Sequence, residues 1–99
     1  MPTKMPKVYN MHRKDAPDDA IYIGRPSRWG NPFEIGKDGT RKEVVAKFRR
    51  MMYQDDKFWS VKRWEVKAEL AGKDLVCFCA PKACHGDVLL EIANAPKEV

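Results

Sequence analysis

The chain has 99 residues, of which 43% are hydrophobic and 33% charged, so we expect one globular domain with a modest core rather than a disordered chain. It has no apolar run long enough to cross a bilayer and no signal peptide, so we expect a cytoplasmic protein without a membrane partner. The net charge of +5 comes from 19 basic and 14 acidic residues scattered along the chain, which favours a mixed-charge surface over a nucleic-acid-binding face.

The N-terminal part predicts an arm, two short strands and a long loop. Residues 1–7 are polar and contain two prolines, so we expect a flexible arm followed by a single domain over residues 8–99. Segment 8–12 alternates weakly, and segment 20–23 is β-branched and aromatic, which predicts two strands. Segment 24–39 is too rich in glycine and proline for regular structure, and loops of that length in small domains are usually functional.

The next part predicts two helices. Thr40 and Glu43 match a capping box, and the apolar residues that follow recur at helical spacing until about residue 54. A second helix is expected over residues 58–71, ended by Gly72. Its expected inward-facing residues are Val61, Trp64, Ala68 and Ala71.

The C-terminal part predicts the remaining strand and helix. Segment 75–79 is short and continuously apolar, as in a strand buried on both faces, and a third helix from about residue 83 must end before Pro96. Two helices between the second and third strands allow a parallel crossover, whereas the first two strands are antiparallel neighbours or are separated in the sheet. We therefore predict a small three-layer α/β domain with a minimal, mostly parallel sheet of about three strands, flanked by three helices.

Two segments directly follow predicted buried strands and hold most of the chemically capable side chains. In parallel sheets, ligands bind outside the carboxyl ends of the strands, where loops lead into helix N-termini. Segments 24–33 and 77–87 both occupy this position, so we expect them to face one another in one site.

The first of these segments has the composition of a ligand cradle. Its arginines suit phosphate or carboxylate, its tryptophan suits stacking, and its glycines allow close backbone approach. Ser27 and Asn31 suit polar orientation of a ligand. The alternative is that Trp29 only packs the loop against the core. The predicted ligand-binding residues are Gly24, Arg25, Ser27, Arg28, Trp29, Gly30 and Asn31.

The second segment suggests nucleophilic or acid–base chemistry by reduced thiols and a histidine. Cys84 and His85 are expected in the first turn of a helix, where exposed N–H groups stabilise a thiolate, and Asp87 would orient the histidine. The alternative is that the cysteines are small core side chains and that Asp87 merely favours the helix start. The candidate catalytic residues are Cys79, Cys84, His85 and Asp87.

The same segment contains the side chains of a zinc site, namely Cys77, Cys79, Cys84 and His85. Its spacing argues against one, because paired zinc cysteines are usually separated by two to four residues, and a helix start does not direct adjacent Cys84 and His85 to one ion. We do not favour zinc, and it remains an alternative cofactor.

The motifs Tyr22-Ile23-Gly24-Arg25, Trp29-Gly30-Asn31-Pro32-Phe33 and Cys77-x-Cys79-Ala80-Pro81-x-x-Cys84-His85-Gly86-Asp87 resemble a family of small phage and bacterial proteins. This family is catalogued as domain of unknown function 4326. The resemblance covers about residues 8–95 and implies a phage or bacterial cytoplasmic protein whose hallmark is these two segments.

Together these observations predict a pocket for a nucleotide, a nucleoside or a related phosphorylated metabolite, formed by segments 24–33 and 77–87. If the pocket is catalytic, we expect a hydrolytic or glycosyl-transfer reaction. Two alternatives remain open. One is a zinc-stabilised structural module, and the other is a phage interaction protein that binds a host protein or nucleic acid.

Overall fold

The computed structural model describes residues 6–25, 27–54, 61–78, 82 and 84–95. Residues 1–5 of the predicted arm lie outside this part, whereas Lys7 already bonds through its carbonyl to the N–H of Leu75 (3.0 Å). The elements in chain order are β1 (Val8–Asn10), the short 3₁₀ helix η1 (Met11–Arg13), β2 (Ile21–Tyr22), α1 (Arg41–Tyr53), α2 (Arg63–Leu70), β3 (Leu75–Cys77) and α3 (His85–Ala93).

The three strands form one parallel sheet in the order β1-β3-β2. Leu75 of β3 is in register with Val8 of β1 on one side and with Ile21 of β2 on the other. The last strand in the sequence is therefore the central one, and the first two strands are separated by it. All three carboxyl ends point to the same edge, which brings the segments after β2 and β3 together.

A capping box explains where α1 begins. The Glu43 N–H donates to the Thr40 hydroxyl, and the Thr40 N–H donates to the Glu43 carboxylate, so the predicted capping box is present. The buried residues of α1 are Val44, Phe48, Met51 and Met52, and those of α3 include the predicted Val88, Leu89, Ile92 and Ala93.

The predicted inward face of the second helix is wrong. Trp64 is 71% exposed, Ala68 and Ala71 are exposed too, and the buried residues of α2 are Val66 and Leu70. Val66 and Leu70 are four residues apart and so share one helix face, whereas Trp64 lies two residues from Val66 and points elsewhere. Val61 is buried as predicted, but it precedes α2. The expected helix start at residue 58 lies outside the described residues.

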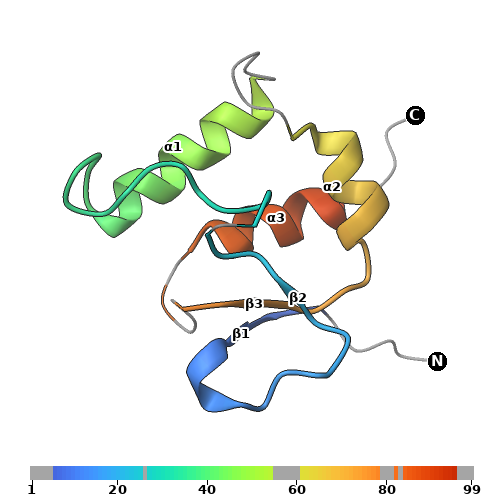
Figure 1. Cartoon of the computed structure of the whole chain (residues 1–99). Helices are drawn as coiled ribbons and strands as arrows, with labels where there is room; N and C mark the ends of the chain where they lie inside the picture. Colours follow the sequence, from blue (N-terminus) through green and yellow to red (C-terminus); the bar gives the residue numbers. More distant parts are fainter. Residues whose placement is uncertain (1–5, 26, 55–60, 79–81, 83, 96–99) are drawn as a thin grey trace.

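The three helices lie on one side of the sheet, which confirms a small mixed α/β domain (Figure 1). Helix α3 contacts β3, and both α1 and α2 pack on α3, so the layers are sheet, α3, and then α1 with α2. Burial along β3 alternates, with Val76 only half-buried, so this strand is not buried on both faces as expected. No helix in the described part of the chain is long and apolar enough to cross a membrane.

Candidate functional site

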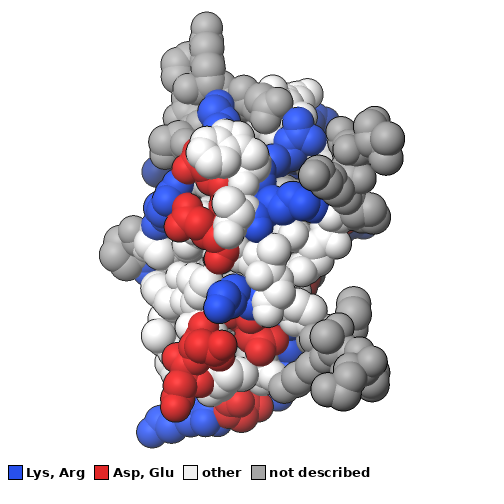
Figure 2. Space-filling model, turned by 90° about the vertical axis from the view of Figure 1, so that its right-hand side faces the viewer, with Lys and Arg blue, Asp and Glu red and all other residues white. Residues whose placement is uncertain are grey.

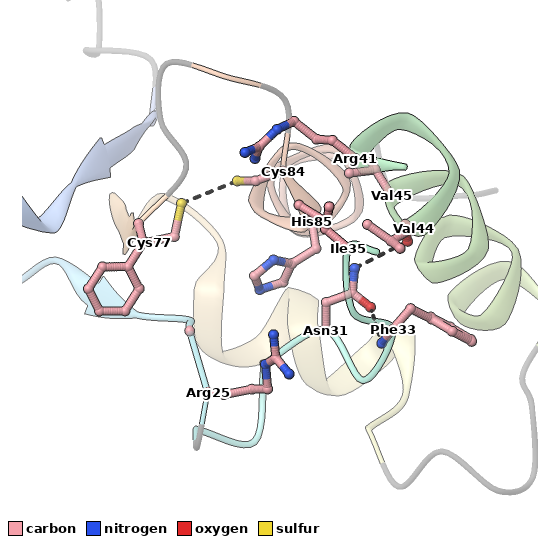
Figure 3. A pocket seen from close by; sticks show the side chains of 12 residues that line it. Arg25, Asn31, Phe33, Ile35, Arg41, Val44, Val45, Cys77, Cys84 and His85 are labelled. Atoms are coloured by element: carbon pink, nitrogen blue, oxygen red, sulfur yellow. Dashed lines mark hydrogen bonds between the residues drawn. The ribbon is translucent and has the colours of Figure 1, made fainter. Parts of the chain in front are cut away.

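A pocket of about 300 Å³ opens at the carboxyl ends of β2 and β3 (Figure 3). Its walls come from the segment after β2, the end of β3, and the first turns of α1 and α3. The lining residues are Gly24, Arg25, Asn31, Phe33, Ile35, Arg41, Val44, Val45, Cys77, Phe78, Cys84 and His85. The two segments singled out in the sequence therefore meet in space, and Arg25 and His85 share one pocket.

Some predicted site residues do not belong to this lining. Ser27, Arg28, Trp29, Gly30 and Asp87 are absent from the described lining. Cys79, a predicted catalytic residue and metal ligand, lies outside the described residues.

Trp29 and Arg28 attach the loop to the body of the protein. Trp29 is 6% exposed and belongs to the hydrophobic core, which corresponds to the packing alternative rather than to ligand stacking. The Arg28 guanidinium lies over the Trp29 ring, 4.8 Å from its centroid, and forms ion pairs with Glu65 and Glu69 of α2. Its predicted role in holding a ligand is therefore replaced by contacts within the protein.

Residue 30 needs to be a glycine because Arg25 lies very close to its backbone. A Cβ atom at this position would lie 2.9 Å from Cγ and 3.2 Å from the backbone nitrogen of Arg25. The absence of a side chain at residue 30 thus allows Arg25 to occupy its position beside the pocket.

Asn31 lines the pocket, but its amide is engaged within the protein at both ends. The Asn31 Nδ2 donates to the Val44 carbonyl (3.1 Å), and its Oδ1 accepts from the Phe33 N–H (2.9 Å). Asn31 therefore joins the loop to the first turn of α1. This makes it a positioning residue for two walls of the pocket.

His85 is held in one tautomer by the backbone. Its Nε2 lies 2.8 Å from the Ile23 carbonyl, and because a carbonyl only accepts, Nε2 carries the proton of the neutral ring and Nδ1 keeps a lone pair. The ring packs edge-on against Phe48. Burial lowers the pKa of His85 below its ordinary value and outweighs the opposing effect of the Ile23 carbonyl. We therefore assign a neutral imidazole at physiological pH.

The two described cysteines form a buried thiol pair. The Cys77 and Cys84 Sγ atoms are 3.3 Å apart, and the Gly86 N–H donates to Cys84 Sγ (3.3 Å) at the start of α3. The hydrogen bond with Cys77, together with burial, raises the pKa of the Cys84 thiol. The expectation of a stabilised thiolate at Cys84 is therefore wrong, because pairing and burial outweigh the effect of the helix N-terminus.

Asp87 caps α3 rather than facing the pocket. Its Oδ2 accepts from the Cys84 N–H (3.2 Å), and the residue is exposed. It thus fulfils the alternative considered for it, that of favouring the helix start. Among the described residues, no group of three or more histidine, cysteine or acidic side chains is placed to hold a metal ion.

Two arginines approach the pocket from opposite sides, with the His85 ring between them (Figure 3). Arg25 follows β2 and pairs with Glu34 (3.1 Å), and Arg41 is the first residue of α1. No carboxylate belongs to the described lining. Arg41 is not recognisable as a site residue from the local sequence pattern, because next to Lys42 it looks like part of an ordinary helix surface. Its place as the first helical residue after the long loop is the signal that would have found it.

Charge on the side of the molecule that carries α2 is mixed. Figure 2 shows basic and acidic side chains interspersed on this face, without a continuous basic surface. This agrees with the mixed-charge surface expected from the composition. The face shown therefore lends no support to nucleic-acid binding.

Comparisons with known proteins identify the family. A family model described as "Domain of unknown function (DUF4326)" matches residues 8–95. The chain is also similar to a protein of Enterobacteria phage T4 described as an uncharacterized 12.4 kDa protein in the nrdA-td intergenic region, with 32% identity over 89 residues, covering 89% of this chain and 77% of the phage protein. No solved structure matches the chain. The resemblance seen in the two motifs is confirmed, and the chain belongs to the family described as domain of unknown function (DUF4326).

Proposed function

We propose that this small phage or bacterial protein binds a nucleotide, a nucleoside or a related phosphorylated metabolite in the pocket between Arg25 and Arg41. The observation that carries the proposal is that both guanidinium groups border one pocket whose described lining contains no carboxylate. A guanidinium pairs with phosphate through two parallel hydrogen bonds, so such a pocket favours anionic ligands.

The remaining lining suits the uncharged part of such a ligand. Phe33, Ile35, Val44 and Val45 provide an apolar wall from the loop and α1. Ligand pockets usually combine apolar walls with a few polar groups, and they range from about 300 to 1,000 Å³. A pocket of about 300 Å³ is at the small end, so it suits one compact molecule rather than a polymer.

Isothermal titration calorimetry with the four common nucleoside 5′-monophosphates, their nucleosides and inorganic phosphate tests this proposal. Arg25→Ala and Arg41→Ala should each weaken binding of the preferred monophosphate by about 10- to 100-fold, since hydrogen bonds to charged groups contribute about 1.5–3 kcal/mol. Arg28→Ala is the matched control, because it removes the same charge from an arginine outside the lining. Equal weakening by Arg28→Ala, or no binding of any compound by the wild type, would contradict the proposal.

A second candidate function is acid–base catalysis by His85 in the same pocket. It is favoured by the fixed tautomer, which leaves the Nδ1 lone pair as a base without a carboxylate in the described lining to share the role. A hydrolytic or glycosyl-transfer reaction needs such a proton acceptor.

His85→Gln tests this second candidate, since glutamine keeps a donor for the Ile23 carbonyl and lacks the base. The variant should bind the preferred compound as the wild type does but show no turnover by liquid chromatography. Turnover at the wild-type rate would exclude His85 as the base, and a wild type inactive on all compounds would argue for a binding protein.

A further inference from the structure

We propose that Glu34 lowers the affinity of this pocket for anionic ligands by competing with the anionic group of the ligand for Arg25. This inference rests on the proposed function. Glu34 lies between Phe33 and Ile35, which both line the pocket, and its Oε1 is 3.1 Å from Nη1 of Arg25. The ion pair thus connects two parts of the loop between β2 and α1 beside the pocket.

The geometry of this ion pair makes it displaceable. Both side chains are about half exposed, at 59% for Arg25 and 45% for Glu34, and such pairs contribute little because water and salt screen them. The contact uses one terminal nitrogen of Arg25, whereas a phosphate engages the fork of the guanidinium through two hydrogen bonds. A phosphate therefore forms more hydrogen bonds with Arg25 than Glu34 does.

Glu34 has a second partner in the surrounding loop besides Arg25. Lys37 Nζ lies 3.7 Å from Glu34 Oε2, the carboxylate oxygen that does not contact Arg25. The backbone of Glu34 is fixed, because its N–H donates to the Asp38 carboxylate (2.8 Å) and its carbonyl accepts from the N–H of Asp38 (2.8 Å). Displacement thus needs only a side-chain rotation and leaves no carboxylate unpaired.

The competition lowers the affinity of the pocket for every ligand that needs Arg25. Glu34 is tethered close to Arg25, and a tethered group acts at an effective concentration of about millimolar. A ligand that displaces Glu34 binds only the fraction of molecules in which Arg25 is released, so its apparent affinity falls by that fraction whatever its own charge. We therefore expect Glu34 to weaken the binding of inorganic phosphate, a nucleoside 5′-monophosphate and its 3′,5′-cyclic form alike.

Titration calorimetry of Glu34→Gln at constant ionic strength tests the inference, with inorganic phosphate, adenosine 5′-monophosphate and its 3′,5′-cyclic form as probes. The variant should bind all three probes about two- to fivefold more tightly than the wild type, which is the effect expected for an exposed pair. Glu69→Gln is the matched control, because it removes the same charge from a similarly exposed pair with Arg28, outside the lining.

The gain in affinity should vanish in an Arg25→Ala background, since Glu34 then has no arginine for which to compete. Unchanged or weaker phosphate binding by Glu34→Gln, or an equal gain in Glu69→Gln, overturns the inference and leaves the proposed function standing. Absence of phosphate binding in every variant overturns both.

Discussion

Replacement of Asn31 by alanine separates a positioning role from ligand contact. The substitution removes the hydrogen bond from Nδ2 to the Val44 carbonyl and the one that Oδ1 accepts from the Phe33 N–H. Val44 keeps its helical hydrogen bond, so the main loss is at Phe33, whose N–H is left without its partner. Asn31 is 9% exposed, so little water reaches the gap.

The expected cost is about 2 kcal/mol of the free energy of unfolding, since an unsatisfied buried donor costs about 1–3 kcal/mol and a lost hydrogen bond about 0.5–1.5 kcal/mol. For a domain of this size, about 2 kcal/mol lowers the melting temperature by about 8–16 °C. Urea denaturation followed by tryptophan fluorescence, to which the buried Trp29 contributes, measures the first quantity, and thermal unfolding by circular dichroism measures the second.

Ser27→Ala is the control in the same loop. The Ser27 hydroxyl is buried and has no hydrogen-bond partner among the described residues, so removing it should leave stability unchanged or slightly raised. An Asn31→Ala variant that unfolds at the urea concentration of the wild type would refute the positioning role of Asn31. If that variant keeps full stability and loses phosphate binding, Asn31 contacts the ligand instead of positioning the walls.

Three further predictions follow from the site. Arg28→Ala should cost about 1 kcal/mol of stability, because Arg28 and Glu69 are about half exposed and only Glu65 is partly shielded from water, and it should leave phosphate affinity unchanged, in contrast to Arg25→Ala. Because burial lowers the pKa of His85, the imidazole of the unfolded chain is protonated at a higher pH than that of the folded chain. The free energy of unfolding should therefore fall as the pH drops below about 6.5, and His85→Gln should flatten this dependence in urea titrations from pH 5 to 8. Because its pKa is raised, Cys84 should react with iodoacetamide, as mapped by mass spectrometry, only after unfolding, and Cys77 should behave alike because it is buried.

Each of these three predictions can be contradicted by one result. Loss of phosphate binding in Arg28→Ala would mean that this arginine reaches the ligand despite its pairing with α2. A pH dependence that is the same in wild type and His85→Gln would mean that another group causes it. Rapid alkylation of Cys84 in the native protein at neutral pH would mean that its thiolate is accessible, as the helix position alone had suggested.

Local signals in the sequence were reliable where neighbours in the chain decide the structure. The capping box at Thr40 and Glu43 set the start of α1, and the spacing of apolar residues set its buried face. The position of both motifs after short apolar runs also located the pocket, because parallel strands place their carboxyl ends at one edge.

The misjudged residues are those whose partners lie far away in the chain. Trp64 fits the helical spacing of an inward-facing stripe with Val61 and Ala68, but the packing of α2 on α3 selects the face with Val66 and Leu70. Arg28 was assigned to the ligand because it lies in the loop, yet its partner Glu65 is 37 residues away.

By itself, the amino-acid order determined which segments are regular and which two of them meet, because capping, periodicity and the direction of parallel strands are encoded locally. Only the tertiary structure decided which side chains enter the pocket and in which protonation state. Those properties depend on burial and on partners such as the Ile23 carbonyl, 62 residues before His85, that become neighbours only when the chain folds.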